Sequence, residues 1–198
     1  MTSQATRDVD VELSGQAYLA PEKRGDIVAG YRLDRGLSNK TTAVYSSLAP
    51  GGAPKIAYRG TKGIEDLWPD VAVAVGAPQL SSRFREAEST ARAARTKYGV
   101  DPSLTGHSLG GSVALRVSKT TGYKSNVFNP GSSVLEKGSV PAGSSVNVKR
   151  GDLIASGYDK DPRPVAFRGF DAIDVANTLM NHPLRGFRSE AGGLKGFF

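Results

Sequence analysis

Short apolar runs alternate with polar, glycine-rich turns along the middle of this chain, and the alternation predicts strands and helices. β-Branched and aromatic positions are typical of strands. We expect strands at 41–48, 55–59, 124–128 and 145–149, and a short one that ends at Gly106. The first two are separated by a loop rich in proline and glycine, which predicts an antiparallel hairpin at one end of a sheet.

Two longer segments have the apolar spacing of helices. In 82–98, one face of the predicted helix carries Phe84, Ala87, Ala91, Ala94 and Tyr98. A second helical pattern follows Gly106 and ends at Gly122, and a short helix is expected at 171–180. Strands that alternate with helices predict an α/β fold, with a mostly parallel central sheet flanked by helices.

The length of 198 residues predicts one domain spanning 1–198, with 1–25 and 188–198 loosely ordered. The chain has no cysteine, which excludes disulfides, zinc–thiolate sites and a cysteine nucleophile. Its only histidines are His107 and His182, which argues against a histidine-rich metal site. We therefore expect neither a metal nor a cofactor.

The formal charge of +7 allows an anionic partner, either nucleic acid or a membrane surface. Basic and aromatic residues are not interleaved as in single-strand nucleic-acid binders, so we expect no nucleic acid and keep an anionic membrane surface as the candidate partner. No apolar run reaches 18 residues and no secretory signal is visible, which favours a cytoplasmic or virion-associated protein. The oligomeric state is not predicted.

The segment Gly106-His107-Ser108-Leu109-Gly110 matches the G-x-S-x-G pattern between a predicted strand and a predicted helix. A serine hydroxyl can attack a carbonyl only if a tight turn holds it clear of the backbone, and the glycines let strand and helix pass closely. The alternative is a glycine-rich turn that holds a serine without chemistry. The flanking elements favour the nucleophile.

A nucleophilic serine needs a base and an acid. His107 adjoins Ser108 on a sharp turn and points elsewhere, which leaves His182 as the base. Among the carboxylates between 108 and 182, Asp152 follows the end of a predicted strand, where the active sites of parallel sheets lie. Asp159 and Asp161 are the alternatives for this role.

The oxyanion of an acyl-transfer reaction needs two hydrogen-bond donors. The backbone N–H of Leu109, at the start of the helix, is one candidate. The second is expected from a loop after an earlier strand, where Thr61 follows Arg59-Gly60. Thr61 can equally be an ordinary residue leaving a strand.

Three segments taken together resemble the class 3 lipase family of α/β-hydrolases: Ala57–Thr61, Asp66–Asp70 and Thr105–Gly111. Asn147–Ile154 and His182–Leu184 are similar to the family's segments around its aspartate and its late histidine, so that the likeness covers about 40–187. The resemblance implies an α/β-hydrolase with Ser108, Asp152 and His182 as the triad. It also implies an oxyanion hole at Thr61 and Leu109, and a lid after Thr61 that carries Trp68.

These observations predict a serine-dependent carboxylic-ester hydrolase, a lipase or phospholipase, that acts on a lipid or small ester through an acyl-enzyme on Ser108. The alternative is a catalytically inactive hydrolase fold that serves as a lipid- or membrane-surface-binding module. A basic nucleic-acid-binding module is a further, less favoured alternative.

Overall fold

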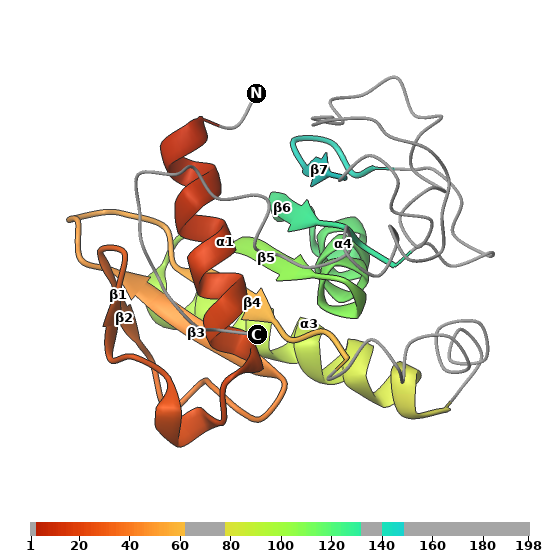
Figure 1. Ribbon diagram of the computed structural model, residues 1–198, viewed down its shortest axis with the longest axis horizontal. Helices are drawn as coiled ribbons and strands as arrows, with labels where there is room; N and C mark the ends of the chain where they lie inside the picture. Colours follow the sequence, from red (N-terminus) through yellow and green to blue (C-terminus); the bar gives the residue numbers. More distant parts are fainter. Residues whose placement is uncertain (1–2, 62–77, 132–139, 149–198) are drawn as a thin grey trace, which may run out of the picture.

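The computed structural model describes residues 3–61, 78–131 and 140–148, and within them a seven-stranded sheet whose strands lie in sequence order, β1 to β7 (Figure 1). The strands are β1 Ile27–Val28, β2 Tyr31–Leu33, β3 Thr42–Ser47, β4 Lys55–Tyr58, β5 Ser103–His107, β6 Ser125–Phe128 and β7 Ser145–Asn147. The helices are α1 Gln4–Tyr18, the 3₁₀ turn η1 Pro21–Lys23, α3 Pro78–Tyr98 and α4 Leu109–Thr121.

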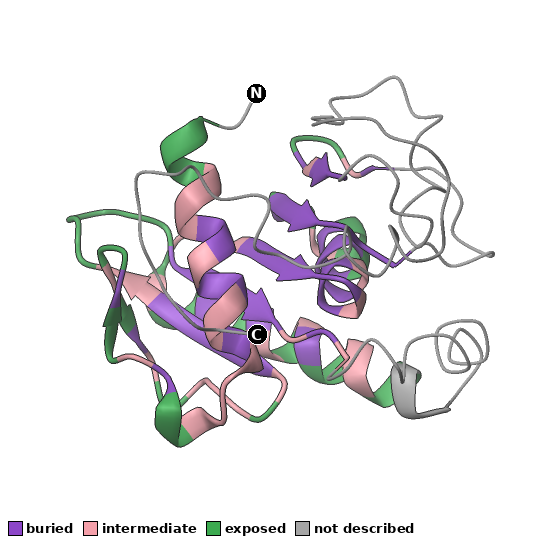
Figure 2. Ribbon diagram, viewed as in Figure 1, coloured by how far each residue is buried: buried purple, intermediate pink, exposed green. Residues whose placement is uncertain are grey.

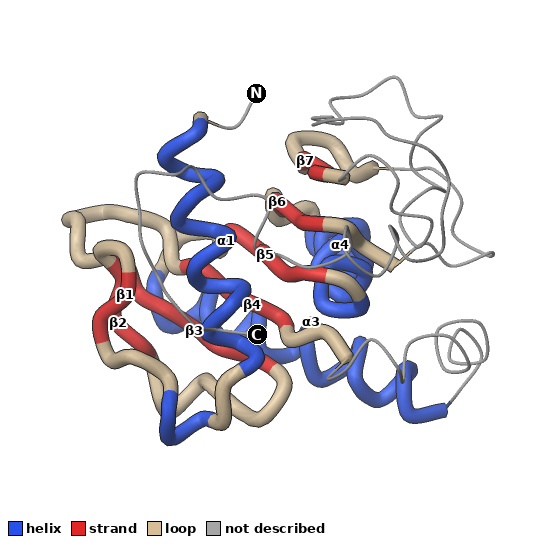
Figure 3. Tube along the Cα trace, viewed as in Figure 1, coloured by secondary structure: helices blue, strands red, loops and turns tan. Residues whose placement is uncertain are grey.

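The helices cover both faces of this sheet and make three layers. Helix α1 crosses one face in front of β3 to β6, whereas α3 and α4 pack together on the other face (Figures 1 and 3). This arrangement follows from strand alternation: in β4, Ile56 and Tyr58 join the core under α3 and α4, whereas Ala57 joins the core under α1. The strands at the centre are therefore buried on both sides (Figure 2).

Three strand pairings, β1 to β4, are antiparallel and three, β4 to β7, are parallel. The expected hairpin is present as β3 and β4, which confirms strands 41–48 and 55–59. Its expected place at one end of the sheet is wrong, because β2 pairs with β3 and β5 with β4. The expectation of a mostly parallel sheet is wrong for the described residues, because β1 and β2 extend the antiparallel half. A turn at Ala29 (φ 49°) and Gly30 (φ 82°) joins them, and positive φ at both positions suits a two-residue hairpin.

The two long helices agree with the apolar spacing, apart from one boundary. Helix α3 begins at Pro78, four residues before the start predicted at 82, and ends at Tyr98 as expected. Helix α4 ends where Gly122 adopts the left-handed conformation (φ 77°), a conformation that glycine adopts without steric cost. The predicted helix at 171–180 lies outside the described residues.

The expectation that residues 1–25 are loosely ordered is wrong for most of this segment, which holds α1. Ser3 caps the helix by accepting a hydrogen bond from the N–H of Thr6 at 3.2 Å. Apolar spacing did not indicate α1 because its buried face mixes polar side chains with apolar ones. Asp10 and Ser14 are buried in that face together with Leu13 and Ala17.

A buried polar network joins α1 to three strands. Asp10 forms an ion pair with Lys55 of β4 at 2.5 Å and accepts a hydrogen bond from Asn126 of β6 at 2.7 Å. The hydroxyls of Ser14 and Thr105, on β5, lie 3.0 Å apart. Because each of these groups would be costly to bury alone, their pairing fixes where α1 lies on the sheet.

Candidate active site

Ser108 lies at the sharp turn between β5 and α4, in a conformation that glycine favours. Its dihedral angles are φ 56° and ψ −130°, and positive φ is unusual for a residue with a side chain. Such strain costs about 1–3 kcal/mol and occurs mainly at functional sites. The strand–turn–helix setting predicted for the G-x-S-x-G segment is therefore present.

The glycines on either side of Ser108 are required by close backbone contacts. A Cβ on Gly106 would overlap the carbonyl group of Gly110, and a Cβ on Gly110 would overlap the carbonyl oxygen of Tyr58 at the end of β4. The first turn of α4 thus packs directly against the ends of β5 and β4. Neither position can carry a side chain without a backbone shift.

Backbone hydrogen bonds hold the turn in place, whereas the Ser108 hydroxyl forms no hydrogen bond with the described residues. The N–H of Ser108 donates to the carbonyl of Phe128 at 3.1 Å, and its carbonyl accepts from Gly131 and Ser112 at 3.2 Å each. The Oγ atom is buried and has no hydrogen-bond partner among the described residues. A buried hydroxyl without a partner is uncommon in folded proteins, and here it belongs to the residue in the strained conformation.

Two predicted oxyanion donors lie near this turn. Leu109 is the first residue of α4, so its N–H has no acceptor within the helix. The loop after β4 runs beside the turn, because Tyr58 pairs with Gly106 in parallel register and a Cβ on Gly60 would meet the carbonyl of His107 at 2.8 Å. Thr61, half-buried, follows Gly60 directly.

The His107 side chain points toward α1, where it contacts Tyr18. The Tyr18 hydroxyl and the Nδ1 atom of His107 are hydrogen-bonded at 2.8 Å, and the same hydroxyl donates to the His107 carbonyl at 3.4 Å. Burial raises the pKa of Tyr18, whereas the charges of Arg83 and Arg59 and a backbone hydrogen bond from Gly60 oppose the rise. Tyr18 is therefore a neutral hydroxyl that touches both the strand end before Ser108 and the loop before Thr61.

Tyr18 was not found from the sequence. The only signal is a spacing of four residues through Asp10, Ser14 and Tyr18, three polar side chains on the face of α1 that meets the sheet. A row of polar residues on a helix ordinarily indicates a solvent-exposed face, so this pattern alone would predict that Tyr18 faces solvent.

The remaining predicted site residues, Asp152, His182 and Trp68, lie outside the described residues, as do the alternative acids Asp159 and Asp161. Strand β7 ends at Asn147, which pairs with Phe128 next to the turn that holds Ser108. The structure therefore describes Ser108, Leu109 and Thr61, the residues predicted as nucleophile and oxyanion donors, and it does not describe the predicted base or acid.

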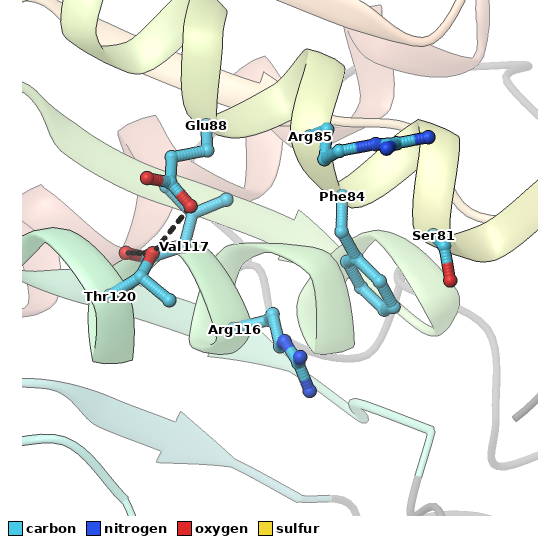
Figure 4. Close-up of a pocket in the computed structure, with 7 residues that line it drawn as sticks. All are labelled: Ser81, Phe84, Arg85, Glu88, Arg116, Val117 and Thr120. Atoms are coloured by element: carbon cyan, nitrogen blue, oxygen red, sulfur yellow. Dashed lines mark hydrogen bonds between the residues drawn. The ribbon is translucent and has the colours of Figure 1, made fainter.

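A surface pocket of about 240 Å³ lies between α3 and α4 (Figure 4). Its wall includes a hydrogen bond of 3.0 Å from Thr120 to Glu88, and the Arg116 guanidinium lies over the Phe84 ring at 5.3 Å. The predicted site residues that the structure describes, Thr61, Ser108 and Leu109, do not line this pocket. Among the described residues, no group of three acidic or histidine side chains is placed to hold a metal ion.

The helices of the described ranges are either too short or too polar to cross a bilayer.

Among curated proteins, none matches the chain. A family model does match: the Tle-like phospholipase domain aligns with residues 22–159, which is 138 of the 198 residues. This match supports a lipase- or phospholipase-like protein without singling out the class 3 lipases, and the mixed α/β sheet is consistent with an α/β-hydrolase-like fold. With most of its length matched, and with a strained serine at the predicted turn, the chain belongs to the Tle-like phospholipase family.

Proposed function

We propose that this protein hydrolyses carboxylic esters of phospholipids through an acyl-enzyme on Ser108. The family match supports lipid hydrolysis in general. The observation that carries the serine mechanism is the conformation of Ser108: a strained, non-glycine residue at positive φ, whose buried hydroxyl has no partner among the described residues.

In the proposed reaction, the Ser108 Oγ attacks the ester carbonyl while its proton passes to His182. Asp152 orients the imidazole and stabilises the imidazolium. The proton then moves to the leaving alcohol as the ester C–O bond breaks, which leaves an acyl group on Ser108. Water, deprotonated by His182, attacks this acyl-enzyme and releases the fatty acid and the free serine.

The oxyanion formed in both steps accepts hydrogen bonds from the backbone N–H of Leu109 and from Thr61. The positive end of α4 adds to this stabilisation, because a helix N-terminus favours nearby negative charge. Trp68, in the segment after Thr61, contacts the substrate in this proposal.

A fluorophosphonate probe followed by peptide mass spectrometry tests the nucleophile directly. We expect the label on Ser108, no label in Ser108→Ala, and ordinary labelling in Ser112→Ala. Ser112 is the matched control because it lies four residues after Ser108, in α4, where its hydroxyl donates to the Gly131 carbonyl at 2.7 Å. A folded protein that binds phospholipid but is neither labelled nor active would instead be an inactive hydrolase fold used for binding.

A further inference from the structure

Three arginines from different parts of the chain converge at the end of β4, beside the oxyanion loop. The N–H of Arg59 donates to the Thr41 carbonyl at 2.9 Å, and the Arg24 guanidinium donates to the next carbonyl, Thr42, at 3.0 Å. Arg83, from α3, donates to the carbonyl oxygen of Arg59 itself. The contact of Arg83 therefore falls on the peptide that leads into Gly60 and Thr61.

The terminal nitrogens of Arg24 are used by the fold, whereas its buried Nε has no hydrogen-bond partner among the described residues. Its two terminal nitrogens donate to backbone carbonyls at 2.8–3.4 Å, those of Ala17, Asn39, Lys40 and Thr42. Arg24 is almost fully buried, at 2% exposure, and its role is to hold α1 against the start of β3. It adds positive charge to the cluster without being free to bind a ligand.

Arg59 and Arg83 differ from Arg24 in how few of their guanidinium donors are used by the fold: among the described residues, Arg83 donates to the Arg59 carbonyl only. The Nε of Arg59 is buried and has no hydrogen-bond partner among the described residues, and neither guanidinium forms an ion pair within that part of the chain. The nearby Glu86 carboxylate accepts a hydrogen bond from Asn39 at 3.0 Å instead. Burial lowers the pKa of Arg83 and repulsion from Arg59 lowers it further, whereas the charge of Glu86 opposes this shift.

The location of this pair connects it to the reaction. A Cβ on Gly110 would lie 2.9 Å from the carbonyl carbon of Arg59, so the peptide that Arg83 contacts packs against the first turn of α4. Gly110 is only two residues from Ser108. The Arg59 peptide, with Arg83 hydrogen-bonded to it, therefore lies close to Ser108, and neither guanidinium forms an ion pair with a described carboxylate, although the charge of Glu86 acts on Arg83.

We propose that Arg59 and Arg83 bind the phosphodiester group of the substrate, and so select phospholipids over neutral glycerides. This inference rests on the proposed phospholipase function and assigns the group of the substrate that these arginines contact. A guanidinium presents a planar fork of donors that fits phosphate oxygens, often in pairs. One phosphodiester between two partly buried arginines would also remove their mutual repulsion.

The test compares two soluble substrates that differ only in the phosphate-bearing head group: short-chain phosphatidylcholine, below its micelle concentration, and the diacylglycerol with the same acyl chains. Arg83→Gln should lower the ratio of kcat/KM for phosphatidylcholine to that for diacylglycerol by about 10–100-fold, the range for a lost charged hydrogen bond. Arg83→Lys, which keeps the charge, should lower it less. Arg85→Gln is the matched control: an exposed arginine on the same helix, whose removal should leave the ratio unchanged.

An unchanged ratio of kcat/KM values in Arg83→Gln overturns the proposal. If kcat/KM falls equally on both substrates and the melting temperature also falls, the role of Arg83 is structural and the proposal is overturned as well. If the wild type hydrolyses neither substrate, the proposed function fails and the binding site is tested separately. In that case a diether phosphatidylcholine, which has no ester to cleave, is titrated by calorimetry into the wild type and Arg83→Gln. Affinity that is at least tenfold weaker in the variant supports the phosphate site, and equal affinity overturns it.

Discussion

The Tyr18 hydroxyl, on the last residue of α1, lies 2.8 Å from the Nδ1 atom of His107, the residue before Ser108. The same oxygen receives a backbone hydrogen bond from Gly60, at the entrance to the oxyanion loop. One side chain from α1 therefore connects the two segments that supply the proposed oxyanion donors. The family match begins at residue 22, after α1 has ended.

We predict that Tyr18→Phe lowers kcat by about tenfold and leaves KM nearly unchanged. Removing the hydroxyl keeps the ring but frees His107 and Gly60 to shift, and a donor that is misplaced for the oxyanion weakens the transition state more than the bound substrate. A tenfold change corresponds to about 1.4 kcal/mol of barrier. Steady-state kinetics on a soluble ester measure the two constants separately.

The control for this prediction is Tyr98→Phe. The Tyr98 hydroxyl donates to Asp34 at 2.6 Å, far along α3 from Ser108, so its loss should cost stability without changing kcat. If the two variants lose equal amounts of stability and neither changes kcat, Tyr18 is a packing residue and not a positioning one.

Ser108→Gly should be more stable than Ser108→Ala by about 1 kcal/mol, because glycine adopts φ 56° without strain and alanine does not. Both variants should lose activity by about 10⁴-fold or more, as expected when a triad serine is removed. Chemical denaturation of the two purified variants measures the difference. Equal stabilities would contradict this prediction. They would show that the backbone at position 108 leaves the strained conformation when the hydroxyl is absent.

The triad itself is tested by substitutions in the part of the chain that follows β7. Asp152→Asn should lower kcat/KM by at least about 100-fold more than Asp159→Asn or Asp161→Asn, because only the orienting acid fixes the imidazole tautomer. His182→Ala should match Ser108→Ala within about tenfold, since triad members act as a unit. If one of the other two aspartates proves essential instead, the acid has been assigned to the wrong position.

The parts of the fold that were predicted from the sequence are those with a single dominant pattern. Strands β3 to β7, helix α4 and most of α3 follow apolar runs bounded by glycine or proline, and the turn at Ser108 follows from its glycines. The short strands β1 and β2 were missed because two or three residues are too few to show a period. The cluster around Arg59 was missed because Arg24 and Arg83 are 35 and 24 residues from it in the sequence, and only the folded chain brings them together.

Helix α3 shows why net charge alone is a weak guide to a membrane partner. Three of the five basic residues at 82–98 have carboxylate partners within the fold: Arg92 with Glu88, Arg95 with Asp101 and Lys97 with Asp34.

We nevertheless predict faster hydrolysis of anionic than of neutral phospholipid vesicles, because the chain carries +7 overall. The difference in rate should shrink as the salt concentration rises to about 0.5 M, because the Debye screening length becomes shorter. Equal rates at all salt concentrations would exclude an electrostatic role for the membrane.

The last prediction concerns the buried ion pair that attaches α1 to the sheet. Burial raises the pKa of Asp10, and the charge of Lys55 and the hydrogen bond from Asn126 oppose the rise, so the ionised pair is held at a desolvation cost. Asp10→Asn should destabilise the protein by about 3–5 kcal/mol, because it leaves the Lys55 ammonium buried without its partner. The double variant Asp10→Asn with Lys55→Met should recover most of this loss, because no uncompensated charge remains. Urea unfolding at neutral pH measures all three proteins. A double variant less stable than Asp10→Asn would show that the Lys55 ammonium, on balance, stabilises this interior even without the carboxylate.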